Sequence, residues 1–285
     1  LSKSKAMTSK PLLPVPPMQR LHLDSVTMCA VSSSNIAATV QALETSLLYI
    51  DVAEAILFTD ADLAAVDVTL SKRIRLVRID PLTSSQAYSD FILNQLVDYI
   101  ATSHCLIVQW DGHVIDPARW RAEFLDYDYI GGSWPQFDDG HDVGNGGFSL
   151  RSRALMAACR TAEFKQHHPE DVAICRTNRC MLECQGLSFA PAELADEFSA
   201  ERAGDPSKTF GYHGVFLMPR VLGADGFWMI YTNLTEYTSL RRDFRTLLLS
   251  LLVGHSRIRR LLTMVSDQCA QVLLCLLYTS PSPRD

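Results

Sequence analysis

The sequence predicts an α/β protein with a mostly parallel sheet flanked by helices and a helical C-terminal tail. Short apolar segments alternate along the chain with segments whose apolar residues recur at helical spacing. The segment 105–108 is apolar without alternation, which is typical of a central parallel strand covered on both faces. Strands that alternate with helices favour a parallel sheet with right-handed crossovers.

The same patterns predict the individual elements. Strands are expected, in chain order, at 25–30, 55–58, 74–79, 105–108 and 187–190. Helices are expected at 36–50, 88–100, 152–163 and 169–183. The sequence contains no internal repeat.

Composition limits the function classes. At 285 residues and 47% hydrophobic content, the chain can bury one sizeable core. A net charge of −6 and a pI near 5.7 argue against nucleic acid as a partner. Eight cysteines, several within apolar runs, indicate reduced thiols and a cytoplasmic protein. Cys175, Cys180 and Cys184 lack a fourth nearby ligand, so we interpret them as helix-face residues rather than a zinc site.

The ends of the chain differ in character from its middle. Residues 1–20 are expected to form a flexible arm, 21–222 a folded domain, and 223–285 a helical tail. Leucine clusters alternate with arginines over 240–262, which predicts either a solvated helical extension or peripheral contact with an anionic membrane or a partner. No apolar stretch reaches the roughly 18 to 20 residues that span a bilayer. Residues 275–285 resemble a translated sequencing-adapter remnant and are left out of the functional interpretation.

Polar loops follow the predicted strands. Loops 32–35, 59–60 and 109–111 should lie along one edge of the sheet, where open α/β proteins bind ligands, and Ser33 is a candidate ligand contact there. Asp111 comes directly after strand 105–108 and could hold Mg²⁺ or Mn²⁺, or simply belong to a turn. The pair Asp60 and Asp62 is an alternative metal motif, although Asp62 could instead cap a turn.

Three further motifs carry candidate chemistry. Asn145, Gly146 and Gly147 lie in a glycine loop, which either allows close approach of a substrate or forms a tight turn. Glu170 and Asp171 follow Pro169 and offer a general base, or ordinary helix-start acids. His213 and Trp134 are two further candidates. Glycines flank His213, which is either a ligand-binding histidine or a structural or surface one. Trp134 belongs to an aromatic-rich segment that suits either sugar rings or core packing.

The order of these motifs resembles a domain-of-unknown-function family of glycosyltransferase-like proteins. The matching segments are Gln109–Val114, Phe124–Gly131, Val143–Arg151, Pro169–Val172, Leu187–Glu193 and Phe210–Gly214, within about residues 21 to 220. That family is similar to the GT-A fold, a Rossmann-type α/β fold. The resemblance implies a metal or diphosphate role for Asp111, a donor and acceptor loop at Gly146 and Gly147, a catalytic base at Asp171 beside Glu170, and a metal-assisting role for His213. Gln109 stands where many such enzymes carry an aspartate, which puts metal dependence in doubt.

The implied function is transfer of a sugar from a nucleotide-diphosphate donor to an acceptor hydroxyl of a glycan or other molecule, by an inverting, general-base mechanism with Mn²⁺ or Mg²⁺. A retaining route stays open. One alternative is a binding module that holds a nucleotide or glycan without turnover. Another is a nucleotidyltransferase, but loop 32–35 lacks the cation expected for a triphosphate.

Overall fold

The structure is a computed structural model that describes residues 20–279, so the expected arm before residue 20 and residues 280–285 lie outside it. The strands are β1 Leu21–Val31, β2 Ile50–Thr59, β3 Ile74–Arg78, β4 His104–Val108, β5 Gly112–Val114, β6 Tyr129–Ile130, β7 Phe148–Ser152, β8 Ser199–Ala200 and β9 Gly211–His213. The α-helices are α1 Ile36–Tyr49, α2 Ser85–Asn94, α3 Arg153–Ala158, α4 Glu170–Val172, α5 Arg179–Cys184, α6 Ala192–Phe198, α7 Met218–Tyr231, α8 Phe244–Ser250 and α9 Arg257–Thr279.

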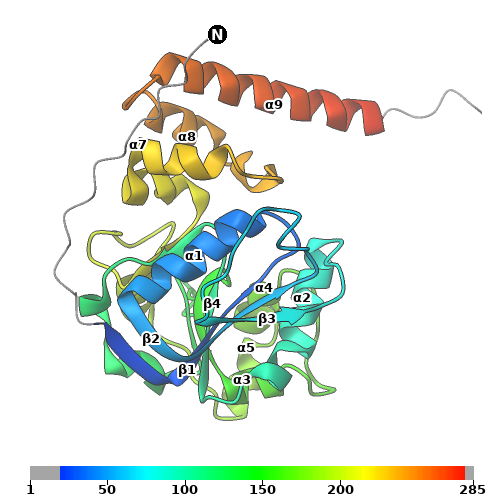
Figure 1. Cartoon of the computed structure of the whole chain (residues 1–285). Coiled ribbons are helices and arrows are strands. Elements are labelled where there is room, and N and C mark those ends of the chain that lie inside the picture. The colour runs from blue at the N-terminus through cyan, green and yellow to red at the C-terminus, as the bar shows by residue number, and fades with distance from the viewer. Residues whose placement is uncertain (1–19, 280–285) are drawn as a thin grey trace, which may run out of the picture.

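A six-stranded sheet of order β3-β2-β1-β4-β7-β6 forms the centre of the protein, with helices packed around it (Figure 1). Strands β3, β2, β1 and β4 run parallel, whereas β7 is antiparallel to both β4 and β6. The predicted α/β class is therefore confirmed. From β1 the chain moves outward to β2 and β3, then returns to the other side of β1 as β4. This reversal makes the carboxyl ends of β1 and β4 the expected ligand crevice.

A smaller sheet, β5-β9-β8, joins two loops that are distant in sequence. Gly112 of β5 pairs with His213 of β9, so the residues after β4 are held beside the late histidine. The close approach depends on a glycine, because a Cβ on Gly112 would lie 2.6 Å from the Tyr212 carbonyl oxygen. Strand pairing thus brings Asp111 and His213 together.

Several predicted elements differ in the structure. Strands β1 and β2 begin four and five residues before the expected 25 and 55, and the helix expected at 88–100 is α2 followed by a 3-10 turn at Leu96–Tyr99. The helix expected at 152–163 ends at Ala158, where the Thr161 hydroxyl donates to the Ala158 carbonyl (2.9 Å). The helix expected at 169–183 is interrupted by a π-turn at Ala173–Thr177, because the Asn178 side chain donates to the Ala173 carbonyl (2.9 Å). Instead of a strand at 187–190, a single bridge joins Phe189 to Tyr129.

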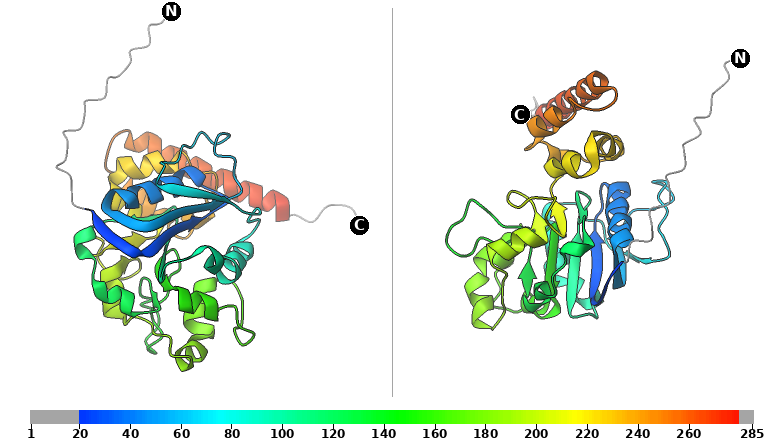
Figure 2. Two further views of the ribbon diagram at one scale, coloured as in Figure 1. Left: turned by 60° about the horizontal axis from the view of Figure 1, so that its bottom comes forward. Right: turned by 90° about the vertical axis from the view of Figure 1, so that its left-hand side faces the viewer.

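The C-terminal helices α7 to α9 are stacked at one end of the molecule, above α1 in Figure 1 and above both α1 and the sheet in the right-hand view of Figure 2. Helix α7 is broken at Gly223 (φ 75°), next to the predicted domain boundary. Side chains before and after this break share one apolar cluster, which includes Tyr212, Phe227 and Leu247. Helices α7 and α8 are thus packed onto the domain, whereas most of the described side chains of α9 are exposed, as a solvated extension would have them, with Ile258 68% and Leu262 67% exposed.

Not every part of the basic segment 240–262 faces solvent. Arg260 is 8% exposed and pairs with Asp225 (2.5 Å), whereas Leu249 and Leu262 are exposed. Within residues 20–279, no helix combines the length and apolar character needed to cross a membrane. Contact between this segment and an anionic membrane surface stays a prediction.

Candidate active site

The glycine loop, Gly144–Gly147, leads into β7 and lies between the acid pair and His213. Asn145 has a left-handed backbone (φ 61°), which asparagine tolerates better than most residues. A Cβ on Gly146 would lie 2.4 Å from Glu170 Oε1, and one on Gly147 would lie 2.0 Å from His213 Nε2. The two glycines are therefore required because protein side chains fill the space beside them. Close approach of a substrate, the reason expected from the sequence, is not needed to explain them.

Replacement of Gly147 by alanine is expected to destabilise the protein by about 1 to 3 kcal/mol, because the new methyl group overlaps the buried His213 ring. Urea unfolding measures this change. Gly226→Ala, within α7, provides the control, because its Cβ would meet, among the described residues, only the Leu222 Cβ, at 3.0 Å, and it should alter the free energy of unfolding by less than about 1 kcal/mol. Equal stability of Gly147→Ala and the parent protein would contradict the described packing.

Asp171 and Glu170 occupy the first turn of α4 but have different surroundings. The Gly146 N–H donates to Asp171 Oδ2 (3.1 Å), and the Val172 N–H donates to Asp171 Oδ1 (2.8 Å). Burial and the adjacent Glu170 carboxylate raise the pKa of Asp171 to about 6. Such a pKa suits a general base that works near neutral pH.

Glu170 is committed to a buried ion pair. Its Oε1 lies 3.1 Å from an Nη of Arg151, which is fully buried, and its Oε2 accepts from Ser89 (3.3 Å). Arg151 also donates to the Ser149 hydroxyl (3.1 Å). Glu170 therefore has a structural role as the partner of Arg151. Asp171, which has no such ion pair among the described residues, is the better candidate for the general base.

His213 stands between two acids on the other side of the glycine loop. Its Nε2 lies 3.3 Å from Asp111 Oδ1, and its Nδ1 lies 3.7 Å from Glu201 Oε1. Burial alone would lower the pKa of His213, but these two carboxylates outweigh burial and raise it to about 10. The imidazole is thus held as a cation beside Gly147.

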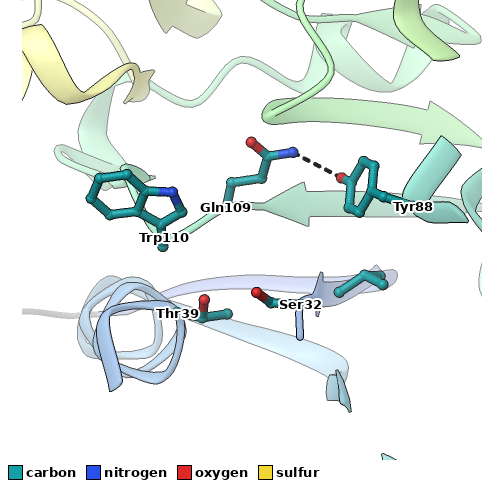
Figure 3. Close-up of a pocket in the computed structure, with 6 residues that line it drawn as sticks. Ser32, Thr39, Tyr88, Gln109 and Trp110 are labelled. Atoms are coloured by element: carbon teal, nitrogen blue, oxygen red, sulfur yellow. Dashed lines mark hydrogen bonds between the residues drawn. The ribbon is translucent and has the colours of Figure 1, made fainter. Parts of the chain in front are cut away.

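Gln109 connects this cluster to the crevice at the ends of β1 and β4. His213 Nε2 is 3.3 Å from Gln109 Oε1, and Gln109 Nε2 donates to the Tyr88 hydroxyl (2.9 Å). Figure 3 shows Gln109 and Trp110 on one side of this crevice and Ser32 and Thr39 on the other, with the Gln109 side chain directed toward Tyr88. A cavity of about 150 Å³ lies there, lined by Val31, Ser32, Thr39, Tyr88, Gln109 and Trp110. The expected edge of the sheet is therefore hollowed where loops 32–35 and 109–111 meet.

A larger outer cavity continues from this crevice. Its volume is about 460 Å³, and it shares Val31, Ser32 and Tyr88 with the inner one. Ser33 lines the outer cavity, where its hydroxyl accepts from the Leu82 N–H (2.9 Å). The two cavities together lie within the size range of about 300 to 1,000 Å³ that is usual for small-molecule sites.

Two other predicted ligand contacts lie deeper than expected. Trp134 is 9% exposed and covers Gly144, whose Cβ would lie 2.1 Å from the indole ring. Asn145 is 4% exposed, and its Oδ1 accepts from the Gly147 N–H (3.4 Å). Both side chains shape the glycine loop. The expected stacking of Trp134 on a sugar is not supported, because its ring packs in the core.

The sequence interpretation missed Arg151, Glu201 and Tyr88. Arg151 lies in a β-strand, where a fully buried cation is rare, and the only signal was its place at the end of the glycine motif. Glu201 follows the two-residue strand β8, which no pattern predicted. These residues reach the site through long-range packing.

The residues around Asp111 fit a divalent cation only with help from a ligand. Within residues 20–279, no three His, Cys, Asp or Glu side chains form a metal-binding group. Apart from its 3.3 Å ion-pair contact with His213 Nε2, Asp111 Oδ1 is nevertheless buried without a hydrogen-bond partner in the described part of the chain. Mg²⁺ in nucleotide sites commonly takes one or two carboxylates and completes its shell with phosphates and water. In the alternative metal motif, Asp62 Oδ1 caps a turn by accepting from the Ala64 N–H (3.1 Å), whereas Asp60 Oδ1 is also buried without a hydrogen-bond partner among the described residues, so this motif stays a prediction.

Comparison with known families adds one finding to this geometry. No curated protein sequence matches the chain. A domain of the family described as "Protein of unknown function (DUF5672)" spans residues 72–213, a range that contains the glycine loop, the acid pair, Asp111 and His213.

Proposed function

We propose that the protein is a glycosyltransferase that moves a sugar from a nucleotide-diphosphate donor to an acceptor hydroxyl, on a GT-A-like fold. The observation that carries this proposal is the convergence of Asp171, the glycine loop, His213 and Asp111 beside the crevice at the ends of β1 and β4. The crevice suits the nucleoside. The polar side chains of Asp171, His213 and Asp111 suit the reacting groups of the donor and acceptor.

Asp171 is the proposed general base. It takes the proton from the acceptor hydroxyl, whose oxygen forms a bond to the anomeric carbon while the bond from that carbon to the diphosphate oxygen breaks. The surroundings support this role because Asp171 is partly exposed, whereas Glu170 is buried against Arg151. Displacement of this kind inverts the anomeric centre.

Charge balance supports a cation at Asp111. The site gathers the carboxylates of Asp111, Glu201, Glu170 and Asp171, and the Arg151 guanidinium is fully buried in its pair with Glu170. A diphosphate that enters such a site needs more positive charge than His213 supplies. Asp111 would hold Mn²⁺ or Mg²⁺ together with the diphosphate, and the ion would neutralise the leaving group. His213, whose Nε2 lies 3.3 Å from Asp111 Oδ1, would donate a hydrogen bond to the same group.

The rate of sugar transfer is expected to depend on pH through Asp171. Its raised pKa means that the carboxyl group is protonated, and inactive as a base, below about pH 6. The rate should therefore fall about tenfold per pH unit below 6 and level off above it. A profile measured at saturating donor tests this, and a rate independent of pH between 4.5 and 7 would contradict the role of Asp171.

Removal of divalent cations is expected to lower the transfer rate at least about tenfold, and Mn²⁺ should restore it. The measurement is nucleoside diphosphate release with and without a chelator. Asp111→Asn should need a higher Mn²⁺ concentration, whereas Asp62→Asn, in the turn after β2, should behave like the parent. Full activity in the presence of a chelator would contradict the proposed role of a divalent cation in the transfer.

Incubation with a panel of nucleotide sugars, Mn²⁺ and candidate acceptors tests the function itself. Release of nucleoside diphosphate that depends on the acceptor supports transfer. Release of pyrophosphate from a nucleoside triphosphate would instead support a nucleotidyltransferase. If neither nucleoside diphosphate nor pyrophosphate is released with any donor, the result contradicts the proposal.

A binding module is the second candidate, and one observation favours it. Both oxygens of Asp171 already accept backbone N–H groups, which is also what a purely structural acid would do. In that case nucleotide sugars would raise the melting temperature without release of nucleoside diphosphate. The same panel therefore separates the two functions.

A further inference from the structure

The loop after β1 is tied to the C-terminal segment by the side chain of Asn35. Its Oδ1 accepts from the N–H groups of Thr235 (2.8 Å) and Glu236 (2.9 Å), and its Nδ2 donates to the Glu236 carbonyl (3.0 Å). The Asn35 N–H donates in turn to the Thr235 hydroxyl (3.0 Å). Asn35 is 2% exposed and has a left-handed backbone (φ 49°), so these bonds are shielded from water. They place Glu236 at the rim of the outer cavity.

The lining of this cavity is unusually rich in hydroxyl groups. The segments 32–34 and 83–85 supply most of them, and Thr238 adds another. Among the described residues that line it, Glu236 is the only one that carries a charge. The hydroxyl of Ser84 caps α2 by accepting from the Ala87 N–H (3.1 Å). Thr83 and Ser85, beside it, offer donors and acceptors to a ligand.

This chemistry favours a neutral ligand over an anion. The N-terminus of α2 borders the cavity and contributes about half a positive unit charge, which would attract a phosphate. The carboxylate of Glu236 contributes a full negative charge on the same cavity, and its Oε1 already accepts from the Thr238 N–H (2.5 Å), so the proposed contact with a ligand falls to its Oε2. A carboxylate is also a strong hydrogen-bond acceptor, and adjacent hydroxyl groups of a sugar ring are suitable donors.

We propose that the outer cavity binds a neutral, polyhydroxylated ring, and that Glu236, positioned by Asn35, selects this ring against its anionic derivatives. The ring is either the ribose of a nucleoside or a hexose. The proposal rests on the proposed function only in treating this ring as part of the donor or acceptor. Since Glu236 lies outside residues 72–213, this selectivity comes from the C-terminal segment and not from the DUF5672 domain.

Isothermal titration calorimetry with two sets of probes tests the proposal. One set contains uridine, guanosine, adenosine and cytidine with their 3′-monophosphates, and the other contains glucose, galactose and mannose with their 6-phosphates. The parent protein should bind at least one neutral ring, and should bind the phosphorylated form of that ring about tenfold more weakly or worse. Binding of a nucleoside would identify the ring as a ribose, and binding of a hexose would identify it as a hexose.

Variants test whether the Glu236 carboxylate itself determines which ring is bound. Glu236→Ala should weaken binding of the neutral ring about ten- to a hundredfold, because a hydrogen bond to a charged group is lost. Glu236→Gln should bring the affinities for the neutral and phosphorylated rings to within about threefold of each other. Asn35→Ala should reproduce the loss of selectivity, and the exposed Glu163→Gln serves as a control that should change neither affinity.

Three results would overturn the inference. They are failure of every neutral ring to bind the parent, preference of the parent for phosphorylated rings, and unchanged selectivity in a folded Glu236→Gln protein. Thermal melts establish that each variant is folded. If selectivity follows Glu236 but no nucleotide sugar releases diphosphate, the transferase proposal fails and this one stands. If transfer occurs but Glu236→Gln leaves the selectivity unchanged, only this inference fails.

Discussion

Replacement of Asp171 by asparagine is expected to lower the rate of sugar transfer about 100- to 10,000-fold, the usual contribution of general-base catalysis. Asparagine has the same shape and can keep the hydrogen bond from the Gly146 N–H through its Oδ1, whereas the bond from the Val172 N–H is lost, so thermal melts must show that the variant is folded. Affinity for the nucleotide should change little, because Asp171 is not among the described residues that line the crevice proposed for the nucleoside. Single-turnover assays with the preferred donor measure the chemical step directly.

Asp126→Asn, a change at an exposed acid, is the matched control and should leave the rate unchanged. The assignment of the base depends on the comparison of the two variants. An Asp171→Asn protein that is folded and retains more than half of the parent rate would show that another group accepts the proton, or that the reaction retains the anomeric configuration.

Replacement of Arg151 by methionine is expected to lower the free energy of unfolding by about 3 to 5 kcal/mol, because it leaves Glu170 buried without its partner. The loss should be largely recovered in the double variant Arg151→Met/Glu170→Gln, in which neither residue is charged. Urea unfolding of the parent, the two single variants and the double variant gives the coupling between the two side chains.

An exposed ion pair provides the control for this cycle. Arg160 and Asp98 lie 2.6 Å apart, with side chains that are 43% and 60% exposed. Arg160→Met should therefore change the free energy of unfolding by no more than about 1 kcal/mol. If Arg151→Met were equally mild, the pair with Glu170 would not be the buried support of the acid site.

The sequence was sufficient to predict the parallel half of the sheet. Its inner strands contain apolar segments, as at Ala55–Phe58 and Cys105–Val108, and the helix Ile36–Tyr49 has clear periodicity, whereas the edge strand β3 includes two arginines. The position of the crevice followed from these strands, because parallel strands end at one edge and the reversal of strand order opens a gap there. Asp111 and Ser33 could be placed near this edge for the same reason.

The remaining features depend on contacts between residues distant in sequence. The break in the helix after Glu170 arises from the Asn178 side chain, and a hydrophobic pattern does not report such a bond. The burial of Arg151 and the pairing of Glu201 with His213 depend on how β7, β8 and β9 come together. The motifs identified which residues matter, but the division of roles between Glu170 and Asp171 required the three-dimensional structure.

A crystal structure of the protein with Mn²⁺ and uridine or guanosine diphosphate tests the central proposal most directly. We expect the nucleoside between Ser32 and Trp110, with the diphosphate directed toward Asp111 and His213 and the Mn²⁺ ion bound to an Asp111 oxygen. The space beside Asp171 should remain open for an acceptor. Binding of the nucleotide on another face, with Asp111 and His213 unchanged by it, would contradict the proposal.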